Sequence, residues 1–195
     1  PMTLAETASI FAETILMKDA IENSSGFEKA KLIEMHLQDS CQVLVDILSR
    51  FYFEKSVFDC RQNSELSSDD FCSLMLNAQE KTYGSGLSDE KHPYIWAVKS
   101  HYYSPHLDFY NFPYAFGLLF ATALFNQYQK AKNQNIDFAP IYKSILQNTG
   151  SFSCEEVCKK AGFDIENIDF WLSGIESFKL ELDELKNYAN SLKNN

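Results

Sequence analysis

The chain has 195 residues, 45% of them hydrophobic, which is enough for one globular domain with a buried core. Its formal net charge of −10, with no basic stripe to meet phosphates, argues against nucleic acid and anionic membrane surfaces as partners. No apolar run approaches the length that crosses a bilayer. The five cysteines include no CxxC pair, which predicts free thiols in a reducing cytoplasm.

The spacing of apolar residues is helical along nearly the whole chain, and strand-like alternation is rare. Loops are short, and no shift in composition marks an internal boundary. We therefore expect an all-α fold in a single domain, residues 1–195. The predicted helices span residues 3–23, 27–53, 67–83, 114–130, 138–146, 153–162 and, beginning at 170 or 175, up to 189.

Local start signals define two of these helices. Ser67 or Ser68 caps the third predicted helix, which opens with two aspartates of the kind that favour a helix N-terminus. Ser153 and Glu156 have the spacing of a capping box. Pro113 is expected to interrupt regular structure just before the strongly apolar fourth helix.

The first seventeen residues form an apolar segment that carries two charges, Glu6 and Glu13. Seven residues make about two helical turns, so both carboxylates are expected on one face of a helix. Small side chains beside them would let another backbone approach closely: Ala5, Ala8, Ser9 and Ala12. A carboxylate buried in such surroundings is costly unless something pairs with it, and a metal ion would do so.

Simpler roles remain open for both acids. Thr3 and Glu6 have the spacing of a capping box at a helix start, and Glu13 has Lys18 nearby as an ion-pair partner. His36 stands on a charged helix and is expected to be partly exposed.

Residues 94–120 are dense in aromatic side chains, and burial in the core explains many of them. We expect such a core role for four phenylalanines: Phe109, Phe112, Phe116 and Phe120. Cys154 and Cys158 are four residues apart, as in part of a metal site, but ordinary packing is the preferred interpretation.

Several segments together resemble the C-terminal part of the oligoendopeptidase F group, in the thimet-oligopeptidase-like family of zinc metallopeptidases. They occur in the family's order and spacing, and they span most of the chain. They are TLAETASIFAE at 3–13, FYNFPYAFGLLFATALFNQY at 109–128, and YKSILQNTG, CEEVCKKAGFDI and FWLSGI within 142–175.

The resemblance implies a multi-helix portion of a zincin-like oligopeptidase catalytic domain, with Zn²⁺ deep in a cleft. In that family two zinc ligands are the histidines of an HExxH helix, and the third is a glutamate further along the chain. By resemblance Glu6 is that third ligand, and Glu13 is a neighbouring acid that orients a ligating histidine.

The resemblance also implies a wall of the substrate cleft. His101, Tyr110 and Tyr114 match residues that contact the substrate or the oxyanion, and Tyr103 and His106 are further substrate-binding candidates. Protonated tyrosine and histidine side chains suit this role, because they can donate hydrogen bonds to a developing oxyanion.

The chain departs from the family in one respect, because it contains no HExxH. It also begins with Pro1 rather than methionine, and we expect it to be cut from a longer protein. The parent is then a zinc-dependent endopeptidase of short peptides, whose N-terminal part carries HExxH and would partner this chain. The chain alone is expected to be inactive, and to self-associate or reorganise along the small-residue face of its first helix. The alternative is a non-enzymatic helical module that binds peptides or proteins.

Overall fold

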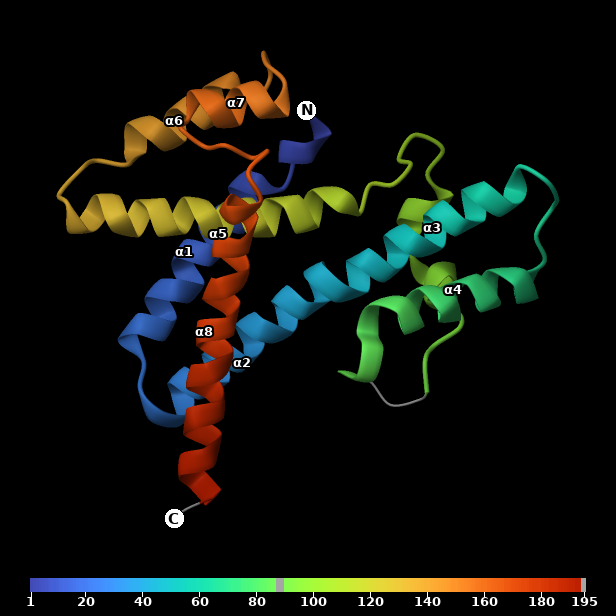
Figure 1. Cartoon of the computed structure of the whole chain (residues 1–195), viewed down its shortest axis with the longest axis horizontal. Helices are drawn as coiled ribbons and strands as arrows, with labels where there is room; N and C mark the ends of the chain where they lie inside the picture. Colours follow the sequence, from blue (N-terminus) through green and yellow to red (C-terminus); the bar gives the residue numbers. More distant parts are fainter. Residues whose placement is uncertain (87–89, 194–195) are drawn as a thin grey trace. The chain divides into compact units, whose positions relative to one another are not determined.

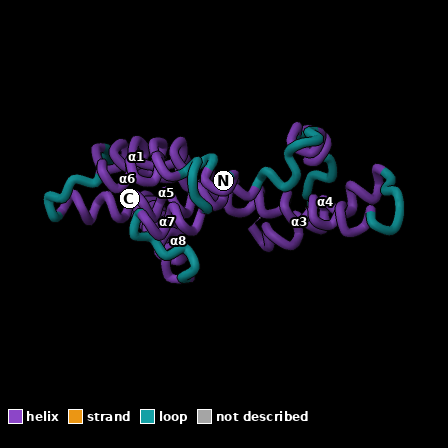
Figure 2. Tube along the Cα trace, turned by 90° about the horizontal axis from the view of Figure 1, so that it is seen from above, coloured by secondary structure: helices purple, strands orange, loops and turns teal. Residues whose placement is uncertain are grey.

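The computed structural model describes residues 1–86 and 90–193, and every regular element in these ranges is a helix (Figures 1 and 2). The predicted all-α fold is thereby confirmed. The α-helices are α1 (Thr7–Asn23), α2 (Gly26–Cys41), α3 (Ile47–Arg61), α4 (Ser68–Tyr83), α5 (Phe112–Asn133), α6 (Ala139–Asn148), α7 (Cys154–Lys160) and α8 (Ile168–Lys193). Shorter turns are the 3₁₀ helices Met2–Leu4, Gly84–Gly86, Ile95–Val98 and Ser100–Tyr103, and the π-helical turn Gln42–Asp46.

The chain divides into two compact units. We call Pro1–Ser40 together with Phe116–Asn195 the terminal unit, and Cys41–Ala115 the central unit. Each unit has its own hydrophobic core. None of the helices in the described ranges is apolar over enough length to cross a membrane.

The core of the terminal unit forms around the apolar stretch of α5. Phe120 is fully buried there, and its ring packs edge-on against Phe163 with centroids 5.6 Å apart. Cys154 and Cys158 of α7 are buried in the same core, as the packing interpretation expected. Figure 1 shows α6 and α7 side by side, which brings their apolar faces to this core.

The core of the central unit lies between α3 and α4, which run side by side (Figure 1). Phe53 and Met75 are its buried centre. Tyr102 packs edge-on against Phe53 at 5.3 Å, and Trp96 lies 5.2 Å from Phe71. The 3₁₀ turns between Ile95 and Tyr103 therefore supply aromatic side chains that complete the core of two helices.

Both predicted caps are confirmed. The Ser67 side chain accepts from the backbone N–H of Asp70, whose carboxylate in turn accepts from the Ser67 backbone. Ser153 and Glu156 form the same reciprocal pair at the start of α7. These motifs are local in sequence, so no distant contact is needed to specify them.

The first helix begins later than the sequence predicts. Met2–Leu4 form a 3₁₀ turn that buries Leu4, and α1 starts only at Thr7. Glu6 occupies the N-cap position without a capping hydrogen bond from its side chain, so the predicted capping box with Thr3 is wrong. Burial of Leu4 in the core sets the turn that delays the helix.

Two other helices run further than predicted. The second continues past Phe53 to Arg61, but the π-helical turn Gln42–Asp46 separates α2 from α3. Asp46 closes this turn by accepting hydrogen bonds from Arg50 and from the Tyr83 hydroxyl, the latter at 2.6 Å. The last helix extends to Lys193.

Pro113 does not interrupt α5, because it lies in the first turn, where a missing N–H costs nothing.

Two expectations about burial are wrong. His36 is buried rather than partly exposed, because its Nδ1 lies 2.7 Å from Glu181 Oε2 of α8. Lys18 also pairs with Glu181, so it does not serve as the partner of Glu13. Phe112, expected in the core, is 38% exposed at the start of α5.

Candidate functional site

Glu6 lies half-buried in the terminal unit, where α1 meets α5. The contact depends on a glycine: a Cβ on Gly117 would stand 3.3 Å from both the carbonyl carbon and the Cβ of Glu6. Such distances are tighter than ordinary van der Waals contact, so the absence of a side chain at 117 permits this approach. The backbone of α5 therefore limits where the Glu6 side chain can go.

The small-residue face of α1 is exposed. Ala8 and Ala12 of α1, with Ala5 just before the helix, are open to solvent, and Leu16 is 72% exposed one turn further along. Glu13 is exposed on the same helix, so the expectation that both acids are buried is wrong for this one. An apolar strip of this kind on a helix is typical of a surface that another element covers.

In the central unit, three predicted site residues lie next to one another. The His101 ring is 5.4 Å from that of Tyr110, which in turn meets the Tyr114 ring edge-on at 6.0 Å. We call these three side chains the His–Tyr row. All three are half-buried, so each retains an accessible part.

One ring nitrogen of His101 is shielded from solvent. Nδ1 is buried and has no hydrogen-bond partner in the described part of the chain. A buried polar atom without a partner is unfavourable, so this nitrogen is available to a bound ligand.

The two remaining substrate-binding candidates differ in position. Tyr103 is 61% exposed, and its hydroxyl donates to the carbonyl oxygen of Ala97 at 3.2 Å. His106 is also exposed. His101, and not His106, lines the cavity described next, together with Tyr103.

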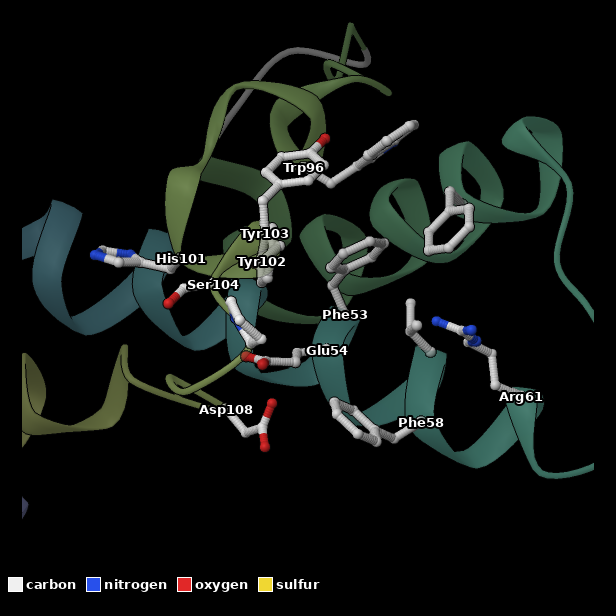
Figure 3. A pocket seen from close by; sticks show the side chains of 13 residues that line it. Phe53, Glu54, Phe58, Arg61, Trp96, His101, Tyr102, Tyr103, Ser104 and Asp108 are labelled. Carbon is white, nitrogen blue, oxygen red and sulfur yellow. The ribbon is translucent and has the colours of Figure 1, made fainter.

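That cavity, of about 540 Å³, opens in the central unit and was not predicted from the sequence (Figure 3). Its walls are mainly aromatic, and three charged residues line it: Glu54, Arg61 and Asp108. The one available sequence signal was the acid at position 54 within an apolar stretch of a helix. The partners from residues 96–108 could not be read from that stretch.

Glu54 is 7% exposed, and its Oε1 accepts the backbone N–H of Phe109 at 2.8 Å. Burial raises the pKa of this carboxyl, the hydrogen bond from Phe109 opposes the rise, and the charge of Asp108 adds to it. Phe109 adopts a left-handed backbone conformation (φ 55°), which is unusual for a bulky side chain. Its ring also stacks on Phe58 at 5.2 Å, so packing and hydrogen bonding together hold this strained residue.

Tyr102 lies beside this carboxylate and stays neutral. Burial, with the negative charge of Glu54, raises the pKa of its phenol. Its hydroxyl donates to the carbonyl oxygen of Arg50 at 3.3 Å. Tyr102 therefore supports the wall of the cavity.

In residues 1–86 and 90–193 there is no group of three or more His, Cys, Asp and Glu side chains that could hold a metal ion. Glu6 supplies one carboxylate, whereas a catalytic zinc site with two histidines and a glutamate needs three protein ligands. A complete site would thus require ligands from elsewhere.

Comparisons with known proteins identify the family. The profile of peptidase family M3 matches residues 1–177. The chain is 30% identical over 191 residues to the chromosomal oligoendopeptidase F of Lactococcus lactis subsp. cremoris. It is 31% identical over 191 residues to the oligoendopeptidase F homolog of Lactococcus lactis subsp. lactis strain IL1403. No solved structure matches the chain significantly.

Each of these alignments covers 95% of this chain but 30% of the relative. The chain therefore spans less than a third of the length of the curated relatives it matches. The family profile covers the chain from Pro1 into α8. The chain belongs to peptidase family M3.

Proposed function

We propose that this chain is part of a zinc-dependent oligoendopeptidase that hydrolyses internal bonds of short peptides in the cytoplasm. The chain contributes Glu6 as the third zinc ligand and the His–Tyr row as one wall of the substrate cleft. Family membership and the adjacency of His101, Tyr110 and Tyr114 support this proposal.

The surroundings of Glu6 fit one ligand of a zinc site. Its carboxylate is half-buried, and close approach of α5 at Gly117 restricts it. When bound, zinc supplies a polarising charge and lowers the pKa of a water molecule. The two further ligands would come from the HExxH segment of the parent protein.

The exposed face of α1 is the surface on which we place that segment. Alanine side chains there would let a second helix approach closely, and Leu16 would be covered. Glu13, exposed on α1, would accept a hydrogen bond from a ligating histidine and hold its ring in position.

The His–Tyr row would act on the substrate carbonyl. The imidazole of His101 and the phenols of Tyr110 and Tyr114 can donate hydrogen bonds, which stabilise negative charge on the carbonyl oxygen as a bond breaks. Removing one such donor in related chemistry lowers kcat by about 10²–10³. Tyr103, more exposed at the cavity, would contact the peptide further from the reacting bond.

A direct test compares zinc binding and peptide cleavage by the 195-residue chain with those of the longest natural form of the protein. We expect the longer form to bind one zinc ion and cleave short peptides, and the chain alone to do neither. Glu6→Gln in the longer form should lower zinc affinity sharply, whereas Asp19→Asn, at an exposed site on α1, should not. Stoichiometric zinc and cleavage by the chain alone would overturn the proposal.

The second candidate is a helical module that binds peptides or a protein without hydrolysing them. The half-buried rings of the His–Tyr row and the exposed apolar side chains of α1 would serve it equally well. Absence of zinc and of cleavage in the longest natural form, with retained peptide binding, would favour this candidate.

A further inference from the structure

The cavity of the central unit has the composition of a cation-binding pocket. Phe53, Phe58, Trp96 and Tyr103 present aromatic rings to it, and these attract a cation through their electron-rich faces. Glu54 also lines the cavity, and Figure 3 shows its carboxylate at one side of these rings, on the same side as Asp108. A volume of about 540 Å³ is within the range of small-ligand sites and exceeds what one long side chain requires.

Glu54 forms no ion pair with a residue in the described part of the chain, although Arg61 lines the same cavity. The one hydrogen bond of Glu54 comes from the neutral backbone of Phe109. Arg50, which lies one turn before Glu54 on α3, pairs with Asp46. A buried carboxylate without an opposite charge is unfavourable, which makes a bound cation the natural complement.

The other charged residues at the cavity define which end is negative. The charge of Asp108 raises the pKa of the Glu54 carboxyl, so two negative charges lie near each other at this end of the cavity. Figure 3 shows Asp108 and Arg61 on opposite sides of Phe58. The acidic end is thus separate from the guanidinium of Arg61, which is exposed.

We infer that this cavity is a specificity pocket for a lysine or arginine side chain of a peptide, with its cationic end at Glu54 and Asp108. The inference rests on the proposed function, because peptides are the ligands of that site. His101 and Tyr103 line the cavity, so a peptide along the His–Tyr row would reach it directly.

Other occupants satisfy the pocket less well. A neutral aromatic side chain would match the walls. It would also displace water from the cavity and leave the Glu54 carboxylate without a counter-charge. An anionic side chain would meet two negative charges at one end. A cationic side chain with an aliphatic stem matches both the walls and the charge.

The two tryptophans provide an experiment that needs neither metal nor hydrolysis. Trp96 lines the cavity, and its Nε1 has no acceptor among the described residues. Trp171 belongs to the terminal unit and donates to the Ile165 carbonyl at 2.8 Å. In ¹⁵N-labelled chain, the Trp96 indole signal reports binding and the Trp171 signal is the internal control, with assignment by Trp171→Phe.

The probe is a blocked Gly-Arg-Gly tripeptide, compared with the same peptide carrying neutral citrulline. We expect the arginine peptide to shift the Trp96 signal and to bind at least about tenfold more tightly than the citrulline peptide. Propylguanidine, a guanidinium without peptide groups or a second charge, should bind more weakly than the tripeptide. Equal binding of propylguanidine would overturn the assignment to a peptide side chain.

The matched variants are Glu54→Gln and Glu65→Gln, which remove the same charge inside and outside the cavity. Glu54→Gln should weaken arginine-peptide binding at least about tenfold, and exposed Glu65→Gln should leave it unchanged. Asp108→Asn, at an exposed position, is the second test if Glu54→Gln perturbs folding. Binding insensitive to both pocket variants, or equal for citrulline, overturns the pocket; failure of the zinc experiment alone leaves this result standing.

Discussion

Gly117 and Glu6 stand so close that a methyl group on Gly117 would lie 3.3 Å from the backbone carbonyl carbon of Glu6. It would also lie 2.9 Å from Ile10 Cδ1, which can move aside, whereas the backbone of Glu6 cannot easily do so. We predict that Gly117→Ala destabilises the terminal unit by about 1 kcal/mol. Overpacking costs about 1–3 kcal/mol, and the gain in helix propensity returns about 1. Denaturant unfolding followed by Trp171 fluorescence in a Trp96→Phe background measures this change.

Gly174→Ala is the control for this prediction. Gly174 is a buried glycine of α8 in the same unit, and an added Cβ would meet Leu119 and Thr122 at ordinary contact distances of 3.4–3.8 Å. Only the propensity gain then remains, so this variant should be neutral or up to about 1 kcal/mol more stable. If both alanine variants changed the free energy of unfolding equally, the close approach of Gly117 to Glu6 would not affect stability.

Glu181 joins three helices of the terminal unit through Lys18 of α1 and His36 of α2. Burial raises the pKa of the Glu181 carboxyl, but the hydrogen bonds and positive charge of His36 and Lys18 outweigh burial and lower it. We predict that Glu181→Gln destabilises the unit by about 2–3 kcal/mol at neutral pH, since charged hydrogen bonds are lost while Lys18, largely shielded from solvent, loses its ion-pair partner. Exposed Glu176→Gln should change stability by less than about 0.5 kcal/mol.

The pH dependence of this effect has a defined sign. A carboxyl whose pKa is lowered on folding contributes stability above its unfolded pKa, near 4.5, and loses that contribution as the pH falls through the folded value. The difference between wild type and Glu181→Gln should therefore be largest above pH 4.5 and shrink in acid. A constant difference across this range would show that Glu181 acts through packing alone.

The sequence predicts those features that depend on neighbours along the chain. The predicted caps at Ser67 and Ser153 are confirmed, because a capping box is complete within four residues. His36 was placed wrongly because its partner, Glu181, lies 145 residues away on α8. The late start of α1 depends likewise on burial of Leu4 in a core built from the second half of the chain.

The candidate site shows the same difference between features set by local sequence and features set by distant contacts. The resemblance selected His101, Tyr110 and Tyr114, and their rings lie in one row, although their roles stay predictions. The cavity beside them combines Glu54 of α3 with side chains from the irregular segment after α4. No periodicity describes that segment, and the left-handed backbone at Phe109 that completes it has no sequence signature such as glycine.

Glu54 provides a second test of pH dependence, with the opposite sign. Burial raises its pKa, so its contribution to stability is present below the unfolded pKa near 4.5 and is lost as the pH rises through the folded value. Glu54→Gln keeps an acceptor for the Phe109 N–H without the charge. We predict that the central unit of this variant is at least as stable as wild type at neutral pH, and that the advantage disappears in acid. Unfolding followed by Trp96 fluorescence in a Trp171→Phe background tests this; a large loss at neutral pH would contradict it.

The exposed face of α1 leads to a prediction about association. Leu16 is 72% exposed and continues the strip formed by Ala5, Ala8 and Ala12. If this strip is a surface that the parent protein covers, the chain alone should self-associate through it. We predict that sedimentation velocity shows association that rises with concentration, and that Leu16→Glu abolishes it by placing a charge on the strip.

Leu180→Glu is the matched control, because Leu180 is 64% exposed but lies on α8. It adds the same charge to the chain, so any difference between the two variants reflects position rather than net charge. We expect Leu180→Glu to associate as wild type does. Association that Leu180→Glu abolishes and Leu16→Glu does not would move the covered surface from α1 to α8, and would remove the structural argument for placing the HExxH segment beside Glu6.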